Sequence, residues 1–303
     1  MADTAMPQER IEALRGHAAM LAFSVLIAGS FSLGARAANL IDPTAISAAR
    51  FVIAAGVIAG FAFAGPGIPR QALRAPWRYL LLGGLFAAYF VLMFEGLKTA
   101  LPVSAAAVFT LTPVMSAGFG WLLLRQRMTG RLAMALALGA AGSLWVIFRG
   151  DIHALRRLDF GRGEAIYLLG CVAHALYTPM VRRLNRGETP LVSTFGTLVA
   201  GAALLSIWGW RAIIETDWAN LPALVWVTLI YVAICASAMT TLLVQYATMR
   251  LPAAKVMAYT YLTPAWVLLL ESALTGAAPA SAMLPGFAAT IVALLLLLKD
   301  QRH

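Results

Sequence analysis

Charged residues are scarce in this sequence, and acidic ones are the scarcest. Only 12% of the 303 residues are charged, with 23 Lys and Arg against 13 Asp and Glu, while 61% are hydrophobic and the mean hydropathy is +0.81. Soluble domains carry roughly a quarter charged residues, because water must hydrate their surface. This deficit excludes an ordinary soluble domain and predicts that the lipid bilayer is the main solvent.

Other absences exclude further classes. The two cysteines, Cys171 and Cys235, each lie within an apolar run, which excludes a disulfide framework and a CxxC site. The sequence contains no HExxH or GxSxG motif and no close pair of membrane carboxylates, so we expect no catalytic residue, cofactor or metal. The net charge of +10 is scattered between apolar segments and forms no stripe, so nucleic acid is not an expected partner.

Long apolar runs dominate what remains. Ten segments approach the roughly 20 residues that a helix needs to cross about 30 Å of hydrocarbon. They are residues 17–36, 44–64, 77–97, 102–124, 132–148, 163–183, 190–210, 222–248, 253–272 and 281–298. Short connections between them predict one tight antiparallel bundle. The expected fold class is an all-α integral membrane protein with ten transmembrane helices.

Basic residues indicate the orientation. Most Lys and Arg fall in the segments that share a side with the N-terminus, which favours cytoplasmic N- and C-termini in a bacterial inner membrane. The loop from Arg149 to Arg162 is an exception, because it puts several arginines on the outer side. Its stretch IHALRRLDF, residues 152–160, is a candidate for a short interfacial helix.

An internal repeat divides the chain into two halves. LPVSAAAVFTLTPV begins at residue 101 and LPAAKVMAYTYLTPAW at residue 251, so Pro102 corresponds to Pro252 and Pro113 to Pro264. Five spans per half place the second half upside down relative to the first, which is an inverted repeat around a central cavity. The predicted divisions are a tail at 1–15, repeats at 16–150 and 162–298, an outer loop at 151–161 and a tail at 299–303.

Pro113 and Pro264 are predicted hinges. Each lies about 17 Å along its helix, near the midplane, and cannot donate to the carbonyl four residues earlier, on Phe109 or Thr260. These carbonyls either face a wet cavity or are satisfied by the hydroxyls of neighbouring threonines. Both interpretations are open from the sequence.

Polar and aromatic side chains recur at helical spacing inside several spans. They predict a substrate cavity walled by rings with a few hydrogen-bonding groups, although single members can equally be links between helices. The predicted substrate-binding residues are Tyr89, Phe90, Phe94, Thr112, His174, Tyr177, Thr241, Gln245, Tyr259 and Thr263. His174 is either a substrate or proton ligand or a satisfied neutral histidine.

Small and acidic residues have simpler interpretations. Gly56 and Gly60 form a GxxxG motif, and a second small-residue stripe runs from Ala135 to Ser143, so both predict close helix packing. Glu95 precedes Lys98 by three residues, which predicts a local ion pair.

The two Leu-Thr-Pro segments and the pair Arg50-Phe51 in the second span resemble the EamA-type repeats of the drug/metabolite transporter superfamily, and within it the YddG-like aromatic amino-acid exporters. This resemblance covers residues 16–298; it departs from the family where Ala277 and Ala278 replace a frequent acid. It implies export of amino acids, aromatic ones included, by alternating access in a monomer. Export of drugs or other small metabolites is the alternative, and the coupling ion stays open.

Overall fold

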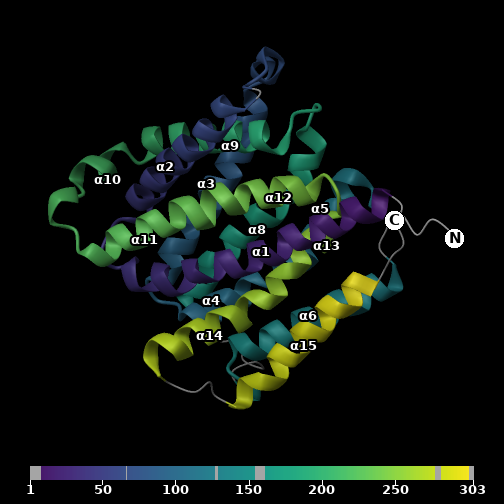
Figure 1. Ribbon diagram of the computed structural model, residues 1–303. Coiled ribbons are helices and arrows are strands. Elements are labelled where there is room, and N and C mark those ends of the chain that lie inside the picture. The colour runs from purple at the N-terminus through teal and green to yellow at the C-terminus, as the bar shows by residue number, and fades with distance from the viewer. Residues whose placement is uncertain (1–7, 66, 127–128, 154–160, 277–280, 300–303) are drawn as a thin grey trace, which may run out of the picture.

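The computed structural model describes residues 8–65, 67–126, 129–153, 161–276 and 281–299, and these parts form helices and connecting turns (Figure 1). The α-helices are α1 (Gln8–Ala37), α2 (Pro43–Ala64), α3 (Trp77–Leu97), α4 (Pro102–Phe109), α5 (Thr112–Leu124), α6 (Gly130–Ile147), α8 (Arg162–Leu184), α9 (Pro190–Trp208), α10 (Trp210–Glu215), α11 (Ala223–Ala233), α12 (Thr240–Thr248), α13 (Ala253–Ala258), α14 (Thr263–Thr275) and α15 (Leu284–Lys299). Short 3-10 segments are η1 (Arg70–Arg74), η2 (Trp218–Asn220), η4 (Tyr259–Leu262) and η5 (Ser281–Met283), and η3 (Ile234–Met239) is a π-helical turn.

The predicted membrane spans are confirmed. Within the described residues, nine helical segments are long and apolar enough to cross a bilayer, and the shorter apolar segment Ser281–Leu297 makes the tenth. The surface is correspondingly apolar, with Phe63, Ile207 and Leu269 exposed by 67%, 75% and 62%. Such large exposed side chains on a helical bundle need lipid around them.

Local sequence sets where helices begin. Pro43, Pro102 and Pro190 lie in the first turn of α2, α4 and α9, where the missing N–H costs nothing. Before α2, the Asp42 carboxylate accepts from the backbone N–H groups of Thr44 and Ala45 at 2.7 and 3.1 Å.

The first helix starts earlier than the sequence predicts. The expected span began at residue 17, whereas α1 begins at Gln8. Glu12 lies in this added part and forms ion pairs with Arg15 at 2.6 Å and with Arg250 at 2.7 Å. Polar pairing therefore extends the helix beyond its apolar stretch. The proposed interfacial helix at 152–160 lies almost entirely outside the described residues, as do residues 1–7 of the first predicted tail and residues 300–303 of the second.

Three spans are interrupted near the centre of the bundle. Helices α4 and α5 are separated just before Pro113, and α13 and α14 are separated by η4 just before Pro264. These two breaks are those that the prolines predict. The third is the π-helical turn between α11 and α12, which no proline marks.

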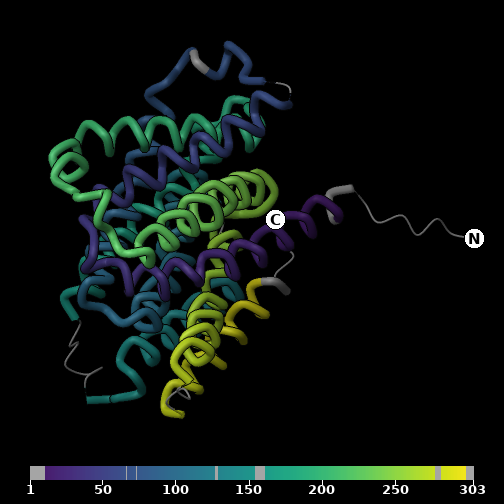
Figure 2. The backbone as a smooth tube through the Cα atoms, turned by 60° about the vertical axis from the view of Figure 1, so that its left-hand side comes forward, coloured from purple at the N-terminus to yellow at the C-terminus, as the bar shows by residue number. Residues whose placement is uncertain are grey.

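Corresponding helices of the two halves pack on one another. α2 lies against α9, α5 against α13 and α6 against α15, so three of the five helices in one half contact their counterparts in the other. Figure 1 shows α6 and α15 side by side at one edge of the bundle. Figure 2 shows α1 running along the bundle, where it packs against α12 and α14. A twofold axis in the membrane plane produces this pairing.

Glycines allow the closest crossings. A Cβ atom on Gly83 of α3 would lie 2.5 Å from the amide nitrogen of Gly201 on α9, and one on Gly142 of α6 would lie 2.7 Å from the carbonyl of Gly286 on α15. The stripe in α6 also packs closely, because Tyr261 lies against Gly139.

The prediction for the GxxxG motif in α2 is wrong. A Cβ atom on Gly56 or on Gly60 would have no heavy atom of another described residue within 4 Å. The motif allows a close approach of two helices, but it does not supply the second helix.

Candidate functional site

A cluster of aromatic side chains fills the centre of the bundle. Helices α3 and α4 of the first half and α8 of the second half contribute its members. We call it the aromatic cluster, and it comprises Phe86, Tyr89, Phe90, Phe109, Tyr167, His174 and Tyr177, all exposed by 2% or less. Ring centroids lie 4.7 Å apart for Phe86 and Phe90 and 4.5 Å apart for Tyr89 and His174. These rings are in contact and span the interface between the halves.

Hydrogen bonds hold several rings in place. The hydroxyls of Tyr89 and Tyr167 lie 3.0 Å apart and join α3 to α8. The Gln245 side chain of α12 donates to the Tyr177 hydroxyl at 2.9 Å. By contrast, Nδ1 of His174 is buried and has no hydrogen-bond partner among the described residues. Buried polar atoms are usually paired, so this nitrogen is a candidate contact for a bound molecule.

The two interrupted spans meet beside this cluster. The Thr112 hydroxyl donates to the Phe109 carbonyl at 2.7 Å and lies 3.4 Å from the Thr260 hydroxyl of the other half. Of the two interpretations that the sequence leaves open, a wet cavity or a threonine hydroxyl, the Phe109 carbonyl follows the second. In the second half the backbone N–H of Thr263 donates to the Thr260 carbonyl, and the Thr263 hydroxyl is buried without a partner among the described residues.

The predicted site residues fall into a central set and an outlying one. Tyr89, Phe90, His174 and Tyr177 belong to the aromatic cluster, and Gln245 bonds to it. Thr112, Thr263, Thr241 and Phe94 are completely buried nearby or in adjacent spans. Tyr259 differs, because its hydroxyl lies 3.1 Å from Nδ1 of His17 on α1. It therefore forms a contact between η4 and α1 and does not join the rings.

One charged residue at the site is not among those that the sequence predicts. Arg50 of α2 is fully buried, and the carbon of its guanidinium lies 3.6 Å from the centroid of the Phe90 ring. Its Nε donates to the Ser237 hydroxyl at 2.9 Å, and Nη2 donates to the carbonyls of Val232 and Ala236 at 3.2 Å. The sequence signal is a charge within a span that has no acid three or four residues away.

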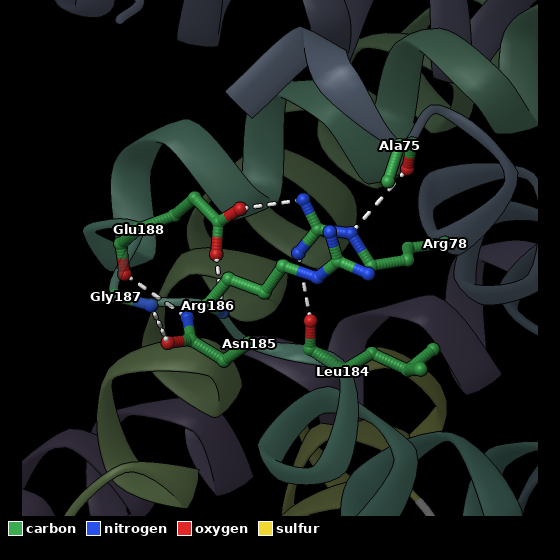
Figure 3. A network of polar contacts seen from close by, with 7 residues as sticks. All are labelled: Ala75, Arg78, Leu184, Asn185, Arg186, Gly187 and Glu188. Carbon is green, nitrogen blue, oxygen red and sulfur yellow. Dashed lines mark hydrogen bonds and ion pairs between the residues drawn. The ribbon is translucent and has the colours of Figure 1, made fainter. Parts of the chain in front are cut away.

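A buried ion pair joins α3 to the loop between α8 and α9 (Figure 3). Arg78 and Glu188 lie 2.6 Å apart with side chains exposed by 3% and 7%, and Arg78 also donates to the Leu184 carbonyl at 2.7 Å. Burial raises the pKa of Glu188, but hydrogen bonds from Arg78 and from the backbone N–H of Arg186 outweigh it and hold that pKa below its usual range. This network fixes the end of the bundle where α3 and α9 begin.

The two ends of the bundle are joined differently. At the end where α1 and α14 finish, Arg36 forms a two-pronged ion pair with Glu271 at 2.8 and 3.0 Å. At the other end, where α8 and α5 finish, Arg183 donates to the Leu123 carbonyl at 3.2 Å. Arg36 and Arg183 occupy corresponding places in the two halves, but among the described residues only Arg36 meets an acid. The predicted Glu95–Lys98 pair is also present, at 2.6 Å.

Comparison with known proteins identifies the family. The chain matches the EamA-like transporter family twice, over residues 14–148 and 161–299. It is a member of this family. The two matches cover the two halves, so this EamA-family protein is a multi-pass membrane transporter of the drug/metabolite transporter superfamily.

Comparison with individual proteins adds one relative and one match of fold. The chain is 30% identical to the uncharacterized transporter YyaM of Bacillus subtilis over 217 residues, which is 71% of each protein. A solved crystal structure with 22% identity superimposes with a TM-score of 0.71 and covers 95% of this chain and 96% of its own, which shows a shared fold.

Proposed function

We propose that this EamA-family transporter exports amino acids, aromatic and other apolar ones included, by alternating access between its two halves. The aromatic cluster carries the proposal, because rings from both halves meet there around a small number of polar groups. Ring faces suit an apolar or aromatic side chain. The amide of Gln245 and the unpartnered Nδ1 of His174 suit the polar end of an amino acid.

The interrupted spans support the alternating movement. The breaks before Pro113 and Pro264 lie opposite one another, where the hydroxyls of Thr112 and Thr260 approach. A helix bends at low cost at a point where its backbone hydrogen bonds are interrupted. Rotation at the two breaks would separate the rings on one side and then on the other, which is how inverted repeats expose one site alternately.

The orientation is part of the proposal. Arg15, Arg74, Arg125, Arg182 and Arg186 lie at the end of the bundle where α1 begins and α8 finishes. Excess basic residues mark the cytoplasmic side of a membrane protein. We therefore place both termini in the cytoplasm of a bacterium, which makes movement toward the other end export.

Counterflow tests the function directly. Proteoliposomes loaded with unlabelled phenylalanine should accumulate labelled phenylalanine and tryptophan at equal pH on both sides. Phe86→Leu should lower tryptophan accumulation by about two- to tenfold relative to leucine accumulation, because ring pairs contribute about 0.5–1.5 kcal/mol beyond burial. Phe63→Leu is the matched control, since this ring of α2 is 67% exposed.

Two results would contradict the proposal. Folded protein that accumulates no amino acid would refute amino-acid export and bring drug or metabolite export to the front. Equal effects of Phe86→Leu and Phe63→Leu on the ratio of tryptophan to leucine would remove the aromatic cluster from the substrate site.

A further inference from the structure

Arg50 lies deep within the membrane part of the protein. It is the eighth residue of α2, about 10 Å from the start of the helix, and its side chain is 0% exposed. A charge at this depth is costly and usually serves a function. The atoms that surround the guanidinium therefore decide whether Arg50 is satisfied by the protein alone.

The π-helical turn η3 satisfies one part of that guanidinium. A turn with hydrogen bonds from residue i to i+5 leaves carbonyl groups without their usual helical partners. Nη2 of Arg50 binds the carbonyls of Val232, near the end of α11, and of Ala236 within the turn, and Nε binds Ser237 within the turn. Arg50 therefore binds the irregular segment between α11 and α12, which no proline marks.

The other part of the guanidinium is unsatisfied. Nη1 is buried and has no hydrogen-bond partner among the described residues, and Arg50 forms no ion pair with any of them. The second buried arginine, Arg78, differs in that Glu188 neutralises it. Arginine stays protonated in proteins, so Arg50 retains a positive charge. The Phe90 face offsets part of the cost of burying the guanidinium, but it supplies no counter-charge.

The unsatisfied charge borders the aromatic cluster. The guanidinium of Arg50 lies over the face of the Phe90 ring. The centroid of that ring lies 4.7 Å from the ring centroids of both Phe86 and Tyr89. Thr241, four residues after Ser237, adds a buried hydroxyl without a partner among the described residues. A fixed cation beside the aromatic cluster matches an aromatic acid rather than an aromatic amine, and the Thr241 hydroxyl one turn beyond Ser237 is a candidate second donor.

We propose that Arg50 binds the carboxylate of the transported substrate, with Thr241 as a second donor. The inference rests on the proposed amino-acid function and adds the position and sign of the charge that selects the substrate. A carboxylate oxygen accepts from Nη1 and neutralises the buried guanidinium. The substrate ring then lies among the rings that include Phe90. Binding and charge neutralisation are thereby coupled at one residue.

A purely structural role for Arg50 makes a different prediction. If the side chain only fixes η3 to α2, replacing it changes folding or overall rate but not the preference among substrate charges. Three ligands with the same ring separate the two roles. Phenylalanine carries both charges, 3-phenylpropionate carries only the carboxylate, and phenethylamine carries only the ammonium.

Competition against labelled phenylalanine counterflow is the first measurement. In the wild type, 3-phenylpropionate should inhibit at a concentration at least about tenfold lower than phenethylamine, since a charged hydrogen bond to carboxylate is worth about 1.5–3 kcal/mol. This comparison needs no variant, so it tests the inference even where substitutions prevent folding. Equal inhibition by the acid and the amine overturns the inference.

Variants then assign the selectivity to Arg50. Arg50→Met should raise the inhibitory concentration of 3-phenylpropionate at least about tenfold and leave that of phenethylamine unchanged, while Arg50→Lys should fall between, because lysine keeps the charge without the planar fork. Arg211→Met is the matched control, because Arg211 also faces a ring, that of Trp210, but is exposed. Unchanged acid selectivity in folded Arg50→Met overturns the inference.

Failure of the inference and failure of amino-acid export give different results. If no amino acid is carried, thermal stabilisation of the purified wild type by 3-phenylpropionate, absent in Arg50→Met, still supports a carboxylate site. If phenylalanine is carried but acid and amine compete equally, the function stands and the inference falls. Counterflow that requires chloride, without acid selectivity, would assign Arg50 to an inorganic anion and also overturn it.

Discussion

The buried pair of Arg78 and Glu188 leads to a strong prediction about stability. Glu188→Gln leaves a guanidinium that is 3% exposed without a counter-charge. Removing one member of a buried pair costs about 3–5 kcal/mol, and we expect about 3 kcal/mol here because the Leu184 carbonyl still accepts from Arg78. For a chain of 303 residues that corresponds to a drop in Tm of about 5 °C.

The chain supplies a matched control on α3. Lys98 and Glu95 form a pair at the same 2.6 Å separation, but their side chains are 31% and 39% exposed. Exposed pairs contribute about 0–1 kcal/mol. Glu95→Gln should therefore shift Tm by no more than about 2 °C, although the two pairs look equally close.

The pH dependence has a definite sign. The pKa of Glu188 is lower in the folded protein than the value of about 4.3 expected when unfolded, so its stabilisation is complete above the unfolded value. It is lost as the pH falls through the folded pKa. The Tm difference between wild type and Glu188→Gln should thus be constant from about pH 6 to 8 and shrink below about pH 4.

Thermal unfolding in detergent, combined with a double-mutant cycle, measures these effects. The cycle uses Glu188→Gln, Arg78→Met and the double variant, and the coupling energy should exceed about 1.5 kcal/mol. A coupling below about 0.5 kcal/mol, or equal Tm shifts for Glu188→Gln and Glu95→Gln, would refute the reasoning that burial rather than distance sets the strength of the pair.

Two further predictions concern the helix contacts. Gly83→Leu should prevent α3 and α9 from approaching and lower Tm by more than about 5 °C, whereas Gly56→Leu should shift Tm by no more than about 2 °C; equal shifts would contradict the assigned crossing. Glu271→Gln should speed amide exchange in the last turns of α1 and α14 several-fold, because Arg36 loses its acid; unchanged exchange there would show that the pair does not hold these helices.

Most of the fold could be predicted from the sequence, because apolar length and proline position act locally. The ten spans follow from runs of apolar residues, and the breaks before Pro113 and Pro264 follow from a missing N–H. The break at η3 could not be predicted in this way. Its partner Arg50 is 187 residues from Ser237 in the chain and meets it only in the folded bundle.

The candidate site was predictable in composition but not in its connections. Helical spacing marks Phe86 and Phe90 as members of one face of α3 and His174 as a member of one face of α8, and the structure brings those faces together. The same reasoning grouped Tyr259 with them, yet its partner is His17, because the facing helix decides which hydroxyl lies near which ring. The prediction of close helix packing at the GxxxG motif of α2 was wrong for the same reason.

The unequal junctions at the two ends of the bundle have a consequence for salt. The contact of Arg36 with Glu271 is a partly exposed pair of full charges, with side chains 32% and 19% exposed, whereas Arg183 meets a neutral carbonyl. Dissolved ions screen a pair of charges over about 8–10 Å at physiological strength and affect a neutral acceptor much less. Added salt should therefore loosen the contact between Arg36 and Glu271 and leave the contact between Arg183 and Leu123 nearly unchanged.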